Sequence, residues 1–192
     1  MGWDEEAATW DDHPAVQAYA QAAYASLVDH LEAHGTALAG RRVLDFGCGS
    51  GLLTVAMAAE ASQVVGLDVS GPMIEVLQSK SVDNVRGVVG GIADHDLGSF
   101  DLITCSSVCA FVDDYPSTVK ALVERLVPGG WLLQWDWELD PQADEPYGLT
   151  REAVSDALLA AELIDVAVRT GFEVPFEGMT MAPILGVGRA PA

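Results

Sequence analysis

Two carboxylates flank a glycine-rich segment in the first third of the chain, and they are the residues best placed to do chemistry. Asp45 lies two residues before the first of three glycines, Gly47, Gly49 and Gly51. Asp68 ends a later apolar run, twenty-one residues after Gly47. Glycine tolerates positive φ and lets the backbone approach a ligand closely, while a carboxylate accepts hydrogen bonds from ammonium and hydroxyl groups. The spacing therefore predicts a site for a small polar ligand.

The glycine spacing does not fit a dinucleotide. A dinucleotide fingerprint needs glycine at its first, third and sixth positions, and the sixth position counted from Gly47 is Leu52. Asp45 would repel a pyrophosphate but attract an ammonium group, and Asp68 at the end of a second strand could accept both hydroxyls of a ribose. An ammonium and a ribose without phosphate describe S-adenosylmethionine. A nicotinamide-dependent oxidoreductase is the weaker alternative.

The elements that would position these residues alternate between strand and helix. The apolar run at 43–46 predicts a strand, and 52–60 predicts the helix after the glycine bend. Ser70 and Thr150 are expected helix caps, and Pro14 and Pro116 are expected in first helical turns. Further strands are expected over 63–68, 84–89, 100–106, 131–138, 163–174 and 181–189. The last two are joined so closely that they must pair antiparallel.

Four motifs in this order resemble the class I S-adenosylmethionine-dependent methyltransferases. The glycine motif Asp45-Phe-Gly-Cys-Gly-Ser-Gly51 comes first, and Gly66-Leu-Asp-Val-Ser-Gly-Pro-Met-Ile74 is similar to the second motif. Phe100-Asp-Leu-Ile-Thr-Cys-Ser106 resembles the family's fourth strand, and Leu126-Val-Pro-Gly-Gly-Trp-Leu132 the turn into its fifth. The resemblance implies an α/β fold: a Rossmann-like, doubly wound, seven-stranded sheet, mostly parallel, with an antiparallel C-terminal hairpin.

The resemblance also implies where the cofactor would be held. Val69 and Met73 would flank the adenine, and the loop at 92–94 would recognise its amino group and N1. The full set of cofactor contacts that it implies is Asp45, Gly47, Cys48, Gly49, Gly51, Asp68, Val69, Met73, Ile92, Ala93, Asp94, Ser106 and Tyr19. Trp10 and Tyr19 either contact the cofactor or merely pack the first helix on the sheet.

The acceptor side of the site is less defined by the sequence. A sulfonium methyl is already activated, so the protein has mainly to align it. We expect a small-molecule acceptor, apolar or cationic, and the groups that could take its proton are Asp113, Tyr115, Asp136, Glu138 and His13. Because no single base stands out, a non-catalytic S-adenosylmethionine-binding protein is the alternative.

Three tryptophans share one face of the strand expected at 131–138. A period of two puts Trp131, Trp135 and Trp137 on the same side. The first two are expected in the core, whereas Trp137 fits a core or a substrate pocket equally well.

No metal site is expected from the clusters of metal-ligating residue types. Asp94, His95 and Asp96 are loop neighbours that rarely converge on one ion. Cys48, Cys105 and Cys109 lack a second pair for a thiolate site and are expected to be reduced.

Length and charge limit the organisation and the partners. The chain has 192 residues and a formal charge of -20. We expect a single domain, with a helical segment at 1–40 over the cofactor site and a core at 41–192, in which residues 1–12 are loosely held and 140–148 form a lid hinge. The acidity argues against nucleic acid and anionic membranes. Without an apolar span or a signal-peptide pattern, a cytoplasmic location is expected.

Overall fold

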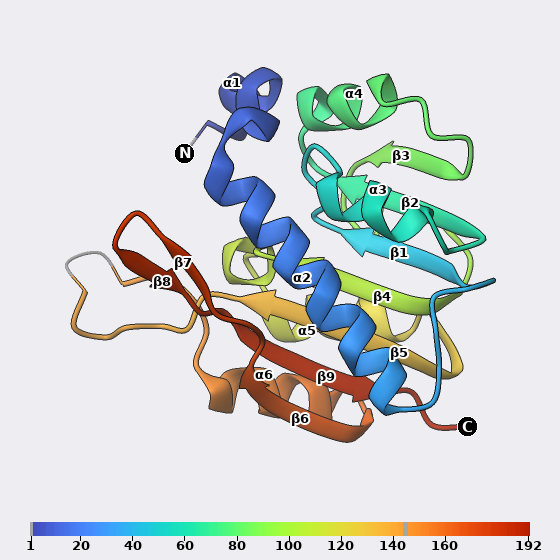
Figure 1. Cartoon of the computed structure of the whole chain (residues 1–192). Helices are drawn as coiled ribbons and strands as arrows, with labels where there is room; N and C mark the ends of the chain where they lie inside the picture. Colours follow the sequence, from blue (N-terminus) through green and yellow to red (C-terminus); the bar gives the residue numbers. More distant parts are fainter. Residues whose placement is uncertain (1, 144–145) are drawn as a thin grey trace.

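A seven-stranded sheet forms the centre of the molecule in the computed structural model, which describes residues 2–143 and 146–192 (Figure 1). The strand order is β3-β2-β1-β4-β5-β9-β6. The neighbours among β1 to β5 pair in parallel, and β9 is antiparallel to both β5 and β6. The strands are β1 (Arg42–Phe46), β2 (Gln63–Asp68), β3 (Val85–Val89), β4 (Phe100–Ser106), β5 (Leu126–Asp136), β6 (Ile164–Thr170) and β9 (Ile184–Arg189). This arrangement confirms the expected Rossmann-like α/β fold.

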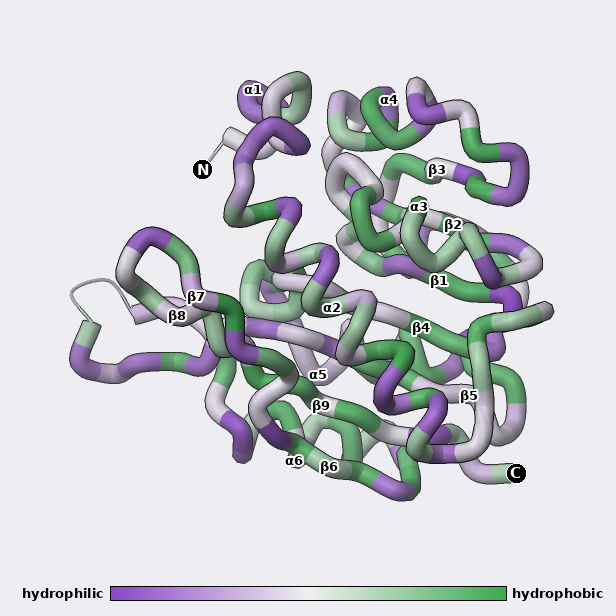
Figure 2. The backbone as a smooth tube through the Cα atoms, in the orientation of Figure 1, coloured by the Kyte–Doolittle hydropathy of each residue, from purple (hydrophilic) through white to green (hydrophobic). Residues whose placement is uncertain are grey.

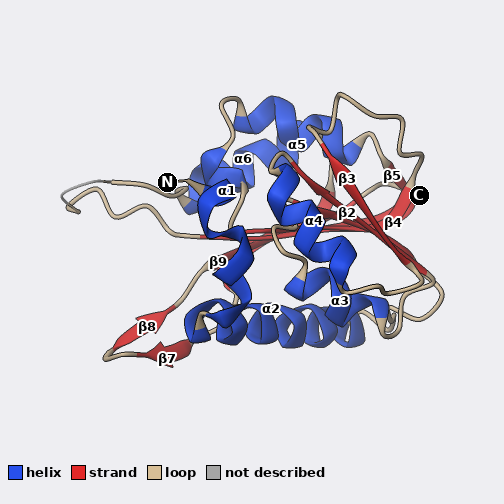
Figure 3. Cartoon of the chain, turned by 90° about the horizontal axis from the view of Figure 1, so that it is seen from above, coloured by secondary structure: helices blue, strands red, loops and turns tan. Residues whose placement is uncertain are grey.

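Helices cover both faces of the sheet, and Figure 3 shows α2 and α3 on one side with α5 and α6 on the other. The helical segments are α1 (Trp3–Glu6), η1 (Ala7–Asp12), α2 (Pro14–Ala33), α3 (Leu52–Ala58), α4 (Gly71–Ser79), η2 (Cys109–Phe111), α5 (Tyr115–Val123) and α6 (Arg151–Ala160). The expected caps are confirmed: Ser70 Oγ accepts from the Met73 N–H and Thr150 Oγ1 from the Ala153 N–H. These side chains satisfy backbone donors that a helix start leaves free.

Alternating residues of the strands build two hydrophobic cores. Leu132 belongs to the core under α5 and α6, whereas Trp131, Leu133 and Trp135 belong to the core under α2 and α3. Trp131 is 5% exposed and Trp135 is fully buried, which confirms both as core residues. Trp135 also donates from Nε1 to Ser26 Oγ of α2 at 3.2 Å. Figure 2 shows hydrophobic residues concentrated along the central strands.

The register of the parallel strands brings their carboxyl ends to one edge of the sheet. Phe46 is paired with Leu67 and Cys105, and Ser106 with Trp135. Asp68 of β2 is paired with Val89 of β3. Because ligands of open α/β sheets bind outside these ends, this edge is the expected location of the site; it is called the rim below.

The C-terminal strands differ from the expected bounds. Each of the strands predicted at 163–174 and 181–189 is interrupted, so the chain forms β6, then a small separate hairpin of β7 (Val174–Phe176) and β8 (Met179–Met181), then β9. Gly171 follows the end of β6, and a Cβ at this position would clash with Trp135. The antiparallel pairing of β6 with β9 is confirmed.

The first twelve residues also differ from expectation. They were predicted to be loosely held, but residues 3–12 form α1 and η1 and pack on α4. Ala7 is only 2% exposed. The polar contacts described below explain this order. The hinge predicted at 140–148 lies partly outside the described residues.

Among the described residues, no helix has both the length and the apolar character needed to cross a membrane.

Candidate cofactor and active site

Asp45 lies beneath the glycine bend, where its side chain is 1% exposed. Its Oδ2 accepts from Thr54 Oγ1 at 2.6 Å and its Oδ1 from Thr104 Oγ1 at 2.9 Å. Burial raises the pKa of Asp45 to about 6, although both threonine hydrogen bonds act to lower it. Its expected direct contact with an ammonium group stays a prediction. In this structure the carboxylate links β1 to α3 and β4 and supports the bend from below.

Asp68 lies where the sequence predicted, at the end of β2 and directly beside the bend. Its Oδ2 accepts from the Gly49 N–H at 2.8 Å, and its Oδ1 from the Ser70 N–H at 2.9 Å. These bonds fix the orientation of the carboxylate, yet each oxygen keeps a second acceptor position. The carboxylate is therefore preorganised and retains the capacity to accept two hydroxyl groups, as a ribose would require.

The glycine bend has the backbone that its sequence predicts. Gly47, Gly49 and Gly51 have φ values of 67°, 53° and 85°. A Cβ at Gly47 would clash with Val108, and one at Gly51 with Leu77. Glycine is required because the backbone is left-handed and because two other segments pack directly against it.

The residues expected around an adenine differ in exposure. Val69 is 75% exposed, whereas Met73 and Ile92 are 2% and 8% exposed. Ala93 is exposed, and Asp94 turns its Oδ2 to its own loop, accepting from the Gly91 N–H at 2.7 Å. Val69 is thus available to a ligand, whereas the side chains of Met73 and Ile92 are buried.

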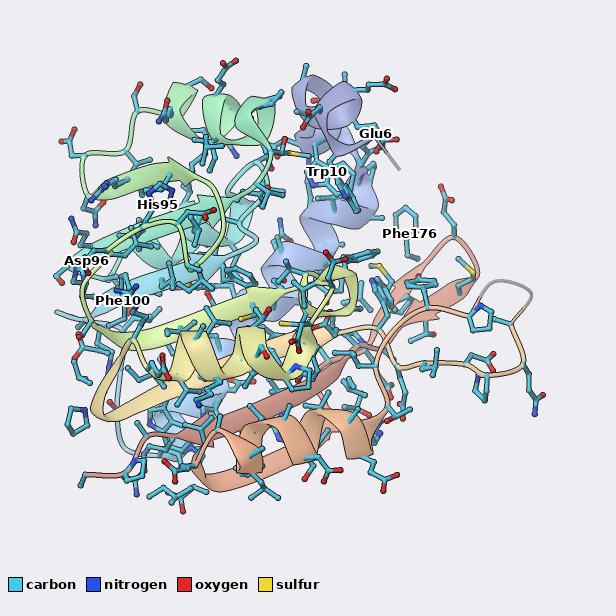
Figure 4. The ribbon with its side chains drawn as sticks, turned by 180° about the vertical axis from the view of Figure 1, so that it is seen from behind. Glu6, Trp10, His95, Asp96, Phe100 and Phe176 are labelled. Atoms are coloured by element: carbon cyan, nitrogen blue, oxygen red, sulfur yellow. The ribbon has the colours of Figure 1, made fainter. Side chains whose placement is uncertain are left out.

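The loop that carries Asp94 uses its other polar groups locally as well. His95 Nε2 contacts the Val89 carbonyl at 2.8 Å, and Asp96 forms an ion pair with Arg125 at 3.1 Å. Figure 4 shows Asp96 at the edge of the molecule opposite to Trp10. The polar side chains of Asp94, His95 and Asp96 therefore stabilise their own loop and its contacts with neighbouring residues of the fold.

The N-terminal segment crosses the cofactor side of the rim. Asp4 Oδ1 accepts from Ser70 Oγ at 2.6 Å, next to Asp68. Asp11 Oδ1 accepts from Ser50 Oγ at 2.5 Å, and its Oδ2 lies 2.6 Å from Lys80 Nζ. Residues 3–12 are therefore attached to both the glycine bend and α4.

Aromatic rings gather where this segment meets two other loops. Trp3 packs edge-on against Trp10 and against Phe111, both with ring centroids 5.6 Å apart. Phe111 lies nearly parallel to Tyr147 at 6.4 Å. Phe111 and Tyr147 are 50% and 56% exposed. These four residues, Trp3, Trp10, Phe111 and Tyr147, are called the aromatic cluster below.

Ser106 is the last residue of β4, and Tyr19 of α2 lies beside the end of β5. The Tyr19 hydroxyl is 3.5 Å from the Trp135 carbonyl, and burial raises the pKa of Tyr19 well above its usual value. Its ring packs against Phe172 and Trp137 at 4.9 and 5.5 Å. Tyr19 thus packs α2 on the sheet, and half-buried Trp137 belongs to the margin of the same core.

The five groups named as possible proton acceptors lie in different environments. Asp113 and His13 are exposed, and Glu138 forms an ion pair with Arg151 at 2.7 Å. The Tyr115 hydroxyl donates to Gln134 Oε1 at 2.8 Å, and burial raises its pKa. Asp136 is fully buried, and burial raises its pKa to about 7. Asp136 alone of these five combines complete burial with a pKa near neutrality.

The three cysteines are free thiols. Cys105 and Cys109 are buried, and Cys48 is partly exposed within the bend. Burial is the largest influence on Cys48 and raises its pKa well above the usual value. A thiol in that state is a weak nucleophile, which fits a lining role.

Comparison with known proteins agrees with this geometry. The family described as "Methyltransferase domain" matches residues 16–174, which is most of the chain. The chain belongs to the methyltransferase domain family. This assignment confirms the resemblance seen in the four motifs and disfavours the nicotinamide-dependent alternative.

Curated relatives share part of the domain. The ubiquinone biosynthesis O-methyltransferase of Idiomarina loihiensis is 36% identical over 106 residues, covering 52% of this chain and 44% of the relative. The protein of the same name from Nitrosospira multiformis is 38% identical over 101 residues, covering 50% and 42%. The matched region thus spans less than half of each relative's length.

Solved structures match over nearly the whole chain at low identity. The magnesium protoporphyrin IX methyltransferase of Synechocystis PCC 6803, solved with S-adenosylmethionine, has a TM-score of 0.70 at 22% identity and covers 91% of this chain and 81% of its own. The N-methyltransferase NodS of Bradyrhizobium japonicum WM9, solved with S-adenosylhomocysteine, has a TM-score of 0.71 at 16% identity with full coverage of both chains. At these identities the likeness establishes the fold.

Several residues of the site were not singled out from the sequence. Thr54 and Thr104, which hold Asp45, lie 9 and 59 positions from it along the chain. Asp4 and Asp11 lie in a segment expected to be loose, and Val108 reaches Gly47 only through the fold. In residues 3–12 the available signal was the pair of tryptophans, Trp3 and Trp10, because large aromatic side chains tend to be buried against other groups.

Proposed function

We propose that this protein transfers a methyl group from S-adenosylmethionine to a small-molecule acceptor. The observation that carries the proposal is the arrangement of Asp68 and Gly49, with a 2.8 Å hydrogen bond between them at the rim of a methyltransferase-family sheet. S-adenosylmethionine, when bound, supplies an already activated methyl group. The chain's own residues have to bind the nucleoside, orient it and exclude water.

The proposed roles follow from the geometry. Asp68 accepts the ribose hydroxyls, for which each of its oxygens has a remaining acceptor position. Val69 covers one face of the adenine, with Met73 and Ile92 beneath it. Asp45 acts indirectly, because its hydrogen bonds to Thr54 and Thr104 hold the start of α3 and β4 in place around the bend.

The aromatic cluster supports an acceptor with an apolar or cationic face. Exposed aromatic rings offer dispersion contacts to flat apolar molecules and attract cations through their π faces. The curated relatives are named as O-methyltransferases of ubiquinone biosynthesis, which favours a hydroxyl acceptor on an aromatic ring. An apolar, a cationic and an aromatic acceptor would each be compatible with the two half-exposed rings of the aromatic cluster, Phe111 and Tyr147.

Charge disfavours anionic partners in this proposal. Lys80 and Arg151 are both engaged in ion pairs with acids, Asp11 and Glu138. Because the protein has a formal charge of -20, it would repel a phosphate-rich nucleic acid. The cytoplasmic location remains a prediction.

A turnover assay tests the proposal. Purified protein is incubated with S-adenosylmethionine and a panel of phenols, catechols and amines, and release of S-adenosylhomocysteine is measured. Release that depends on one acceptor class supports methyl transfer. Tight binding of S-adenosylhomocysteine by calorimetry without release for any acceptor would favour the alternative, a non-catalytic cofactor-binding protein. If fluorescence titration showed that the protein binds reduced nicotinamide dinucleotide and not S-adenosylhomocysteine, both the methyltransferase and the non-catalytic alternative would be contradicted.

A further inference from the structure

Asp136, the last residue of β5, has an arrangement that packing alone does not explain. Its side chain is 0% exposed and lies on the face of the sheet covered by α5 and α6. Oδ1 accepts from the Ala110 N–H at 3.1 Å. Oδ2 has no hydrogen-bond partner within the described part of the chain. A buried acceptor left without a partner is costly, so its presence calls for a reason.

The segment that Asp136 holds lies between the two halves of the site. Ser107, in a left-handed conformation with φ 54°, donates its N–H to the Trp135 carbonyl at 2.7 Å. Val108 packs on Gly47 so closely that a Cβ there would clash. Phe111 contacts Trp3 in the aromatic cluster. Residues 107–111 therefore connect the glycine bend with the acceptor side, and the Ala110 N–H is held by Asp136.

A merely structural anchor would not need to be ionisable. An asparagine could accept from the same Ala110 N–H without any charge. Burial raises the pKa of Asp136 to about 7, although the Ala110 N–H lowers it, so the ionised form is disfavoured by the fold. Groups that reduce stability and can change charge near neutral pH are concentrated at functional sites.

The titratable groups that face Asp136 come from every element packed around it. They are Cys105 of β4, Cys109 of η2, Tyr115 of α5 and Tyr19 of α2. None of these four carries a positive charge in either protonation state. The charge of the carboxylate is therefore balanced by polar groups of residues 109 and 110, first among them the Ala110 N–H, which ties its ionisation to the position of the loop.

We propose that Asp136 is a positioning residue of the methyl-transfer site: its ionised carboxylate clamps residues 107–111 through the Ala110 N–H, which holds Val108 against the glycine bend and Phe111 in the aromatic cluster. The inference rests on the function proposed above. A charged acceptor forms a stronger hydrogen bond than a neutral one, so the clamp tightens when Asp136 loses its proton.

The test compares wild-type protein with Asp136→Asn, which keeps the shape and one acceptor oxygen but has no charge. Asp83→Asn is the matched control, because Asp83 is an exposed acid away from the site. The affinity for S-adenosylhomocysteine is measured by calorimetry at about pH 6 and about pH 8, on either side of the pKa of Asp136.

The affinity of the wild type and of Asp83→Asn should rise about fivefold between the two pH values, the difference between a charged and a neutral hydrogen-bond acceptor. In Asp136→Asn the affinity should stay level. Equal pH responses in wild type and Asp136→Asn would overturn the inference while leaving the proposed function intact. Failure of the wild type to bind at either pH would overturn both.

Unfolding provides a second readout. Because the pKa of Asp136 is raised in the folded protein, the unfolded chain releases this proton first as pH rises. The free energy of unfolding of the wild type should therefore fall relative to Asp136→Asn between about pH 4 and about pH 7, and level off above that range. A constant difference across this range would mean that Asp136 is only a structural anchor and would contradict the inference.

Discussion

Asp45 and Asp68 show how two acids at similar sequence positions come to play different parts. Both end or nearly end neighbouring parallel strands, but Asp45 lies one residue before the end of β1 and points into the molecule, between Thr54 and Thr104. Asp68 is the final residue of β2 and lies at the rim, held by backbone N–H groups of Gly49 and Ser70. One position along a strand therefore separates a supporting carboxylate from one that can meet a ligand.

Replacing Asp68 with alanine should greatly weaken cofactor binding. Two hydroxyl contacts to an ionised acceptor contribute about 1.5 to 3 kcal/mol each, so the affinity for S-adenosylhomocysteine should fall by at least about 100-fold in calorimetry. Asp68→Asn, which retains one acceptor oxygen, should lie between wild type and Asp68→Ala. Asp83→Ala removes an exposed acid elsewhere and serves as the control. An unchanged affinity in Asp68→Ala would rule out the ribose assignment.

At the scale of elements, the N-terminal segment contacts parts of the site that lie far from it along the chain. Residues 3–12 precede α2, yet they reach the glycine bend and α4 through Asp4 and Asp11. The segment has little hydrophobic burial of its own, with Ala7 as its buried residue in η1. Its attachment therefore depends on a few polar contacts, which single substitutions can remove, together with the ring contact between Trp3 and Phe111.

Replacing Asp11 with alanine should loosen this segment. The change removes the hydrogen bond to Ser50 and the half-exposed ion pair with Lys80, together worth about 1 to 2 kcal/mol. Amide hydrogen exchange in residues 3–12 should then be about 5- to 30-fold faster by mass spectrometry. Asp12→Ala is the control, since Asp12 is an exposed neighbour. Equal exchange in the two variants would show that Asp11 does not hold the segment.

At the scale of the whole molecule, charge is the dominant feature. The chain of 192 residues contains twenty-nine acidic residues but only nine lysines and arginines, which gives it a formal charge of -20. Repulsion between like charges opposes the compact state and is screened by salt, because the Debye length falls from about 10 Å at 0.1 M to about 3 Å at 1 M.

The thermal midpoint should therefore rise when potassium chloride is increased from about 0.1 M to about 1 M, since screening removes repulsion that the folded state experiences more strongly. Differential scanning calorimetry measures the midpoint. Sucrose at matched osmolality controls for effects that do not depend on charge. A midpoint that falls with salt, while sucrose raises it, would show that attractive ion pairs such as Asp11–Lys80 outweigh the repulsion.

The sequence by itself determined the fold class, the glycine bend, the position of Asp68 and the burial of Trp131 and Trp135. Each of these depends on local information: hydrophobic periodicity, glycine spacing or the residue that follows a strand. The tertiary structure alone decided the orientation of Asp45, the attachment of residues 3–12, the separate β7–β8 hairpin and the clamp between Asp136 and Ala110. These contacts join positions far apart along the chain, and periodicity carries no information about which distant partner a side chain will meet.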